Sequence, residues 1–196
     1  MILGGNKMSD ENTVDYGPLT KLIGTWKGDK GTDIAPEPDG QENNPYYETI
    51  VFSAIGTVEN AETQVLAVLH YRQIVQRKSN DEVFHDETGY WMWDAANATI
   101  MHSLTIPRGV CVLAGGKHNG GANADGSLVL EVKAGIDDKN WSVVQSPFMQ
   151  ENARTTSFSH RITVDDTQMQ YCETTMLEIY GRSFEHTDEN TLSRQP

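Results

Sequence analysis

The sequence predicts an all-β fold with an antiparallel sheet, and three observations support this class. Apolar and polar residues follow the period of a β-strand over most of the chain. Beyond residue 24, no window shows the apolar spacing of an amphipathic helix. The segments between the β-rich runs are mostly short and carry Asp, Asn, Ser and Gly, which favour turns. Because connections this short cannot hold a parallel crossover, neighbouring strands are expected to run antiparallel.

The first expected element is a short helix. Pro18 suits a first helical turn and Gly24 suits a helix end, so residues 17–24 are predicted to form one or two helical turns. The polar residues 1–16 before it are expected to be flexible. A single domain is therefore expected over residues 17–196.

About ten or eleven strands follow this helix. Their sequential order allows either two stacked sheets or a closed up-and-down barrel, and composition does not choose between these architectures. The expected strands span residues 24–30, 49–56, 63–75, 83–93, 98–105, 109–114, 127–132, 141–147, 155–164, 168–177 and 182–192.

Two longer segments are predicted to be loops. Residues 33–45 are acidic and rich in proline, which indicates a solvated insertion near a barrel mouth, and a lid over a pocket is its functional interpretation. Residues 115–126 are rich in glycine but precede a strand and lack the GK[ST] ending of a phosphate-binding loop. We therefore predict a flexible hairpin loop for this second segment.

Charge and composition limit the classes of partner. The chain has 15 basic and 28 acidic residues, and this net charge of −13 disfavours binding to nucleic acid or to anionic membrane surfaces. No segment approaches the roughly 18 consecutive apolar residues of a membrane span. The N-terminus lacks the pattern of a signal peptide. We expect a cytoplasmic protein in which Cys111 and Cys172 are free, buried thiols. A homodimer remains an open alternative.

The search for catalytic motifs leaves one histidine of interest. The chain has no GxSxG, no HExxH and no cysteine cluster with zinc spacing. The six histidines, at positions 70, 85, 102, 118, 160 and 186, are scattered, so a metal site built from three of them is a minor hypothesis. His186 alternates with Phe184 and Leu192 at period two on the last strand. Such an imidazole can point into a barrel and serve as an axial ligand of haem iron.

Several motifs resemble one family. Residues 18–28 (PLTKLIGTWKG) are similar to the short helix and G-x-W-x-G opening of the nitrobindins, which are haem-binding ten-stranded barrels. Residues 83–91 (VFHDETGYW) resemble the family's M-H-x-E-x-G-Y strand, and residues 101–115 resemble its following hairpin. Met176, ten residues before His186, reproduces the family's spacing from methionine to ligand. The likeness covers residues 18–194.

The resemblance implies a closed antiparallel up-and-down barrel of about ten strands with a short N-terminal helix. It also implies haem b as cofactor, His186 as the ligand of the iron, and Met176 facing the pocket. His85, with Phe84 where the family has methionine, would lie near the distal side. Trp26 and Gly28 would pack within the opening strand. Family members are linked to binding of nitric oxide and to conversion of peroxynitrite to nitrate.

Two other functions stay open from the residues alone. One is a non-catalytic carrier of a fatty acid or another small apolar ligand, which needs a buried cation for the carboxylate. Arg72, Arg154 and Arg161 lie on predicted strands and are the candidates. The other is a barrel filled by its own side chains with no ligand, which is compatible with the aromatic run at residues 90–93.

Overall fold

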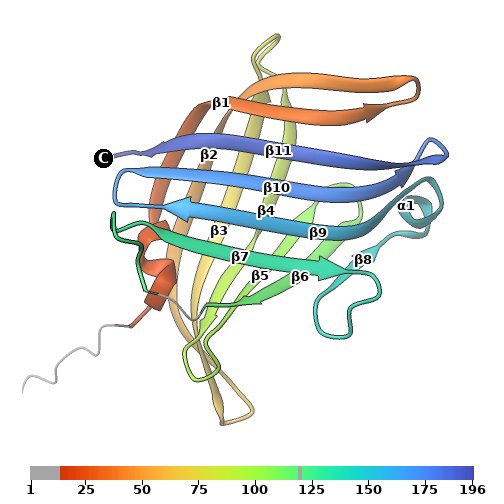
Figure 1. Cartoon of the computed structure of the whole chain (residues 1–196). Coiled ribbons are helices and arrows are strands. Elements are labelled where there is room, and N and C mark those ends of the chain that lie inside the picture. Colours follow the sequence, from red (N-terminus) through yellow and green to blue (C-terminus); the bar gives the residue numbers. More distant parts are fainter. Residues whose placement is uncertain (1–13, 119–120) are drawn as a thin grey trace, which may run out of the picture.

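The computed structural model of the chain, described here over residues 14–118 and 121–196, is built around one sheet of eleven strands (Figure 1). A short 3-10 helix precedes the strands and a short α-helix follows β8. The elements are η1 (Gly17–Leu22), β1 (Gly24–Glu37), β2 (Gly40–Asn60), β3 (Gln64–Arg77), β4 (Val83–Asp94), β5 (Thr99–Ile106), β6 (Val110–Lys117), β7 (Leu128–Gly135), β8 (Ser142–Gln145), α1 (Pro147–Asn152), β9 (Ala153–Val164), β10 (Gln168–Ile179) and β11 (Arg182–Arg194).

The sheet closes on itself as a barrel. Its strand order is β5-β4-β3-β2-β1-β11-β10-β9-β7-β6-β8, and a further pairing of β5 with β6 completes the ring. The paired strands are antiparallel, and ten strands form the wall while β8 is an extra strand beside β6. The predicted all-β, up-and-down barrel is therefore confirmed. The first and last strands of the chain, β1 and β11, lie side by side in the wall.

One end of the barrel is closed by η1. Its own side chains Leu19 and Leu22 are completely buried. The indole N–H of Trp26 donates to the carbonyl oxygen of Leu22 at 2.7 Å, and the Arg194 guanidinium lies 4.2 Å from the Trp26 ring centroid. The short helix expected at residues 17–24 is confirmed as a single 3-10 segment. Trp26 packs in the opening strand as the family resemblance implies.

The opposite end, here called the open end, carries the β1–β2 and β10–β11 turns together with β8 and α1. Here Gln145 of β8 joins β9 through its side chain, which accepts from the Thr155 amide and donates to the Thr155 carbonyl. Helix α1 was not predicted, because six residues are too few for a helical period to show. Its local signal is Ser146, which caps the helix, followed by Pro147 at the first position.

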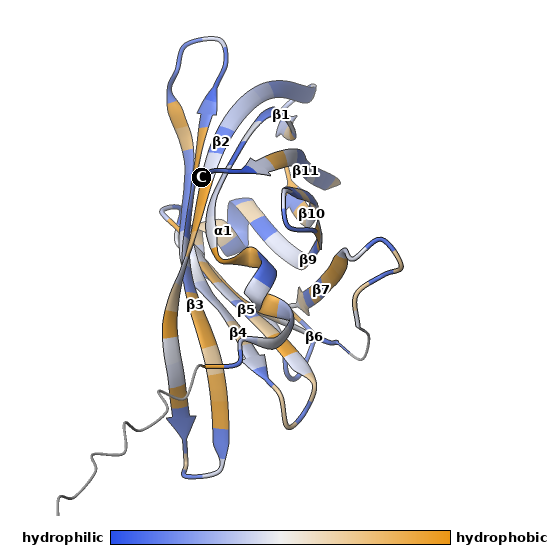
Figure 2. Cartoon of the chain, turned by 90° about the vertical axis from the view of Figure 1, so that its left-hand side faces the viewer, coloured by the Kyte–Doolittle hydropathy of each residue, from blue (hydrophilic) through white to orange (hydrophobic). Residues whose placement is uncertain are grey.

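Apolar and polar residues alternate along the strands (Figure 2). The inward-facing apolar side chains form the core near the closed end. Its largest fully buried members are Trp26, Trp91, Tyr71, Leu19, Leu22, Leu69, Ile100, Leu130, Ile162, Met169 and Leu192. Within the described residues, no helix has the length and apolar character needed to cross a bilayer.

The prediction of a loop at residues 33–45 is wrong. These residues form the ends of β1 and β2 around a turn at Pro38 and Asp39, with unbroken pairing from Gly31↔Tyr46 to Glu37↔Gly40. Pairing of β1 with both β2 and β11 outweighs the unfavourable strand propensity of this acidic, proline-containing segment. The flexible segment expected at residues 1–16 lies outside the described residues except for 14–16. Tyr16 among these packs against the core.

The cysteine prediction is half wrong. Cys111 and Cys172 are free, as expected, but both thiols are exposed rather than buried. The reason is strand parity, because each lies between two inward-facing residues. Cys111 is flanked by Val110 and Val112, which are 5% exposed, and it therefore points outward.

Gly89 tests how closely the strands of the barrel approach. A Cβ atom at Gly89 would lie 1.9 Å from the carbonyl oxygen of Ser103 on β5, whereas one at Gly40 would meet nothing within 4 Å. We expect Gly89→Ala to lower the free energy of unfolding by about 1–3 kcal/mol or more, because the backbone must shift. Gly40→Ala is the matched control, with an expected change within about 0.5 kcal/mol. Urea denaturation measures both, and equal midpoints for the two variants would contradict this account of Gly89.

Candidate functional site

His186 lies on the inner face of β11 near the open end. Phe184, Asp188 and Leu192 share this face, because residues two apart on a strand point the same way. The fully buried Leu192 fixes the direction of the whole row. His186 therefore shares one face of the strand with Phe184 and Leu192, as expected.

Solvent reaches this end of the barrel interior. The side chains of His186, His85 and Glu173 are inward-facing by strand parity, yet they are 33%, 26% and 20% exposed. Inward-facing side chains near η1, such as Trp26 and Leu192, are fully buried. The interior is therefore closed by core packing at one end and accessible at the other.

The imidazole of His186 is held by a carboxylate from β1. Its Nε2 lies 2.6 Å from Oδ1 of Asp33, a side chain only 7% exposed. The other carboxylate oxygen of Asp33 accepts from the Nδ2 of Asn44 at 3.1 Å. Burial lowers the pKa of His186, but the hydrogen bond and charge of Asp33, with the charges of Asp188 and Glu173, outweigh it and raise that pKa.

His85 faces the same end from across the barrel. Three strands, β1, β2 and β3, separate β11 from β4 along the wall, so His85 projects from the other side. Its Nε2 lies 3.5 Å from the Glu87 carboxylate. Burial opposes ionisation of His85, but the hydrogen bond and charge of Glu87 raise its pKa to about 9. His85 is therefore protonated at neutral pH.

From His186 toward the closed end, the next inward-facing groups are polar rather than apolar. The Tyr46 hydroxyl donates to Asp188 and lies 2.7 Å from the hydroxyl of Tyr171. Burial raises the pKa of Asp188 to about 7, supported by the charges of Glu173 and Asp33. At neutral pH the protonated and ionised forms of Asp188 are therefore both populated.

Glu48 forms the centre of a second buried group. Its two carboxylate oxygens accept from Asn190 and from Gln73, each at 2.7 Å. Burial is the main cause that raises the pKa of Glu48 to about 8, and the nearby charge of Asp188 adds to it. Glu48 is therefore mostly protonated at neutral pH.

Two further histidines lie deeper in the barrel. His102 is fully buried, stacks on Trp91 with ring centroids 4.2 Å apart, and has its Nε2 2.8 Å from the Tyr71 hydroxyl. Since that hydroxyl donates to Glu87, the Nε2–H of His102 must donate to Tyr71. Burial lowers the pKa of His102 to about 3, so this ring is neutral. His160 Nδ1 lies 3.2 Å from Glu173 without hydrogen-bond geometry.

These histidines do not assemble a metal site. Four of the six point into the barrel, which is more convergence than the scattered sequence positions indicated. Within the described residues, however, no group of three or more histidine, cysteine or acidic side chains has a metal-binding arrangement.

The structure separates the four site residues that the sequence analysis named. His186 and His85 lie on the inner wall at the open end. Phe84 lies there too, beside a register shift in β4, with its ring 6.3 Å from that of Tyr46. Met176 is different, because it pairs with the exposed Glu185, whereas the neighbouring Thr175 pairs with His186. By strand parity Met176 therefore lies on the outer face of β10.

Sequence reasoning missed the acidic residues of the site. Asp188 could have been found, because it lies two residues beyond His186 on the same strand face. Asp33 was assigned to a loop, and no local pattern links it to a histidine 153 positions away. Glu48 and Glu173 also face inward, on β2 and β10.

The arginines proposed to bind a carboxylate inside the barrel are on the wrong face. Arg72 pairs with Asp86 at 2.7 Å and Arg161 with Glu131 at 3.5 Å, and both arginine side chains are 56% exposed. Arg154 is exposed as well. All three occupy outward positions of their strands, so the expected buried cation is not supplied by them.

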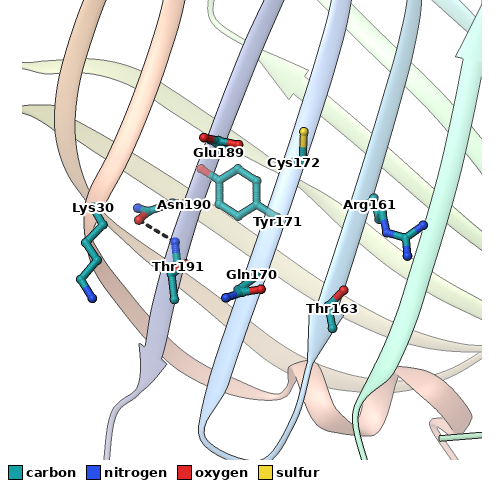
Figure 3. Close-up of a pocket in the computed structure, with 9 residues that line it drawn as sticks. All are labelled: Lys30, Arg161, Thr163, Gln170, Tyr171, Cys172, Glu189, Asn190 and Thr191. Carbon is teal, nitrogen blue, oxygen red and sulfur yellow. Dashed lines mark hydrogen bonds between the residues drawn. The ribbon is translucent and has the colours of Figure 1, made fainter. Parts of the chain in front are cut away.

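A pocket of about 390 Å³ lies on the outer side of the wall (Figure 3). It forms where a register shift interrupts the pairing of β1 with β11 between Lys27 and Thr32. Its lining comes from β1, β9, β10 and β11 and comprises Lys30, Arg161, Thr163, Gln170, Tyr171, Cys172, Glu189, Asn190 and Thr191. Since neither His186 nor Asp33 lines it, this pocket is separate from the histidine site.

Comparison with known proteins identifies one family. A family model described as a THAP4-like, heme-binding beta-barrel domain matches residues 15–194. Among solved structures, the crystal structure of Rv2717c from M. tuberculosis is similar, with a TM-score of 0.67 and 20% sequence identity over 93% of this chain and 100% of that chain. At this identity the likeness supports the fold. No curated protein sequence gives a significant match.

The raised pKa values in the barrel predict how stability depends on pH. A group whose pKa is higher in the folded state stabilises the fold fully below its unfolded pKa and loses that effect as pH rises through its folded pKa. For Glu48, Asp188 and His85 the folded values are about 8, 7 and 9. The free energy of unfolding should therefore fall between about pH 5 and 9, by up to about 1.4 kcal/mol per pH unit for each proton released.

Urea denaturation at pH 5, 7 and 9 measures this dependence. Glu48→Gln should show a shallower decline than the wild-type protein, because one of the groups with a raised pKa is gone. The outward Glu131→Gln, on β7, is the control and should retain the wild-type slope. A Glu48→Gln slope equal to that of the wild type would refute the role of Glu48.

Proposed function

Because the chain belongs to the nitrobindin family of THAP4-like, haem-binding β-barrel domains, we propose that it binds haem at the open end of its barrel with His186 as the iron ligand. The observation that carries this proposal is the position of His186. Its imidazole is inward-facing, one-third exposed and anchored by Asp33. Among the inward-facing side chains of β11 that can bind iron, His186 lies nearest the open end, so an entering ligand would reach it first.

The residues present fit an axially ligated haem by the chemistry of their donor groups. Metal-bound histidines characteristically give their second ring N–H to a carboxylate, and Asp33 supplies that partner. His85 and Phe84 lie across the barrel, where the second face of a flat cofactor would lie. At the rim, the Arg77 guanidinium lies 4.6 Å from the Phe84 ring centroid and supplies a positive charge for a carboxylate of the cofactor. Met176 is left out of the proposed contacts because it faces outward.

We further propose haem b as the cofactor and nitric oxide or peroxynitrite as its ligands. A ferric haem held by His186 would supply a Lewis acid, to which nitric oxide could bind and which would promote rearrangement of peroxynitrite to nitrate. His85, with its pKa near 9, would offer a positive charge to an anionic substrate on the side facing His186. The β-barrel wall would limit the approach of water to the open end.

The acidic interior favours this proposal over a fatty-acid carrier. Asp33, Asp188, Glu48 and Glu173 all face inward, and the arginines considered for a carboxylate lie outside. A fatty acid would place its alkyl chain among these hydrogen-bonded polar groups, which offer it no apolar wall. A cationic ferric iron would instead be stabilised by nearby carboxylates.

Haem binding is tested by titrating the purified protein with hemin. We expect a saturable Soret band in the wild-type protein and a shifted or absent band in His186→Ala, because the iron loses its axial ligand. Affinity should fall by more than the roughly 10–100-fold cost of losing an outer partner of a metal ligand.

Met176→Ala is the control for this titration. Since Met176 faces outward, its variant should bind hemin as the wild-type protein does. An unchanged spectrum in His186→Ala would exclude His186 as the ligand, and a spectrum altered equally in Met176→Ala would contradict the assignment of strand faces.

A fluorescent fatty-acid probe tests the carrier alternative. We expect no saturable binding at micromolar concentrations, because the interior beside His186 is lined by hydrogen-bonded polar groups rather than by an apolar wall for an alkyl chain. Fluorescence should stay unchanged when protein is added, and prior loading with hemin should make no difference. Tight probe binding that hemin displaces would favour the carrier function.

A further inference from the structure

Asp33 is bound at both of its carboxylate oxygens. His186 holds Oδ1 at 2.6 Å and Asn44 holds Oδ2 at 3.1 Å, and the side chain is 7% exposed. Its backbone is fixed as well, since Asp33 pairs with Asp188 on β11 and with Asn44 on β2. A buried carboxylate fixed in this way can set the orientation of the imidazole that it contacts.

We propose that Asp33 is a positioning residue that orients His186 toward the haem iron and increases the electron donation of its ring, an inference that rests on the proposed haem site. An imidazole has two nitrogens, so the iron takes the one that Asp33 does not hold. Within the described residues, the Nδ1 of His186 has no hydrogen-bond partner, whereas Nε2 is engaged by Asp33.

The physical effect of Asp33 follows from its charge. A carboxylate that accepts the ring N–H makes the imidazole a more basic ligand. A more basic ligand stabilises ferric iron more than ferrous iron, because the ferric ion carries the larger charge. Asp33 therefore lowers the reduction potential of the bound haem and keeps its iron in the ferric state.

Asp33→Asn is the main test, because asparagine keeps the size of the side chain and removes the charge. The haem-loaded protein is examined by resonance Raman spectroscopy of the iron–histidine stretch in the ferrous state and by redox titration. We expect a lower stretching frequency and a higher midpoint potential than in the wild-type protein. Each tenfold loss of preference for ferric over ferrous iron raises the one-electron potential by about 59 mV.

Hemin affinity gives an independent readout. It should fall by about 10–100-fold in Asp33→Asn, the usual cost of losing an outer partner of a metal-binding histidine. Asp86→Asn is the matched control, since it removes the same charge from the outer face of β4, where Asp86 contacts Arg72. Frequency, potential and affinity should all keep their wild-type values in this control.

The outcomes separate this inference from the proposed function. If His186→Ala abolishes the Soret band while Asp33→Asn leaves both frequency and potential unchanged, haem binding stands and the role of Asp33 is refuted. If the wild-type protein binds no hemin, or if His186→Ala keeps its spectrum, both fail. Should Asp33→Asn not fold, the wild-type frequency itself decides. A value no higher than that of a haem–imidazole complex in the same buffer refutes the proposal.

Discussion

The pairing of β1 with β11 is the constraint on which the candidate site depends. It joins the first strand of the barrel to the last, and its register places Asp33 beside Asp188 and Ile34 beside Thr187. Because the side chains of Asp33 and His186 both point inward, closure of the barrel brings a carboxylate and an imidazole together across 153 positions of sequence. Without this closure, β1 and β11 would be two edge strands and the pair would not exist.

The interior divides into two parts with different chemistry. Near η1 the inward-facing side chains are apolar and fully buried, which stabilises the barrel. Toward the open end they are carboxylates, tyrosines and histidines in hydrogen-bonded groups. Burying such groups costs free energy unless their partners are present, and the raised pKa values of Glu48 and Asp188 reflect this cost. The titratable side chains therefore lie where solvent enters the barrel, and the apolar core that stabilises the fold lies at the other end.

The family match and the structure agree on the barrel and add different information about the site. The family model spans residues 15–194 and makes haem the leading ligand class. The structure adds that Asp33 lies beside His186, that Phe84 lies near the open end of β4, and that Met176 faces outward. These contacts define the surroundings of the histidine that we propose as the iron ligand.

Much of the fold was predictable from local patterns. Alternation of apolar residues and turn-forming residues between them identified all eleven strands, because both signals arise from backbone geometry over a few residues. The six-residue α1 escaped because it is shorter than two helical turns. Residues 33–45 were placed in a loop because their composition is poor for a strand. The segment is extended because its two halves pair with each other and because β1 also pairs with β11, which lies at the other end of the chain.

What the sequence alone determined was the all-β class, the succession of strands along the chain, and the face that His186 shares with Phe184 and Leu192 on the last strand, because each depends on period and on local turns. The tertiary structure decided which face Met176 occupies, since the pairing of β10 with β11 places Met176 beside the outward-facing Glu185. It also decided that Asp33 holds His186 and that the interior at the open end is acidic. Those features depend on contacts between strands at the two ends of the chain, and no local pattern records them.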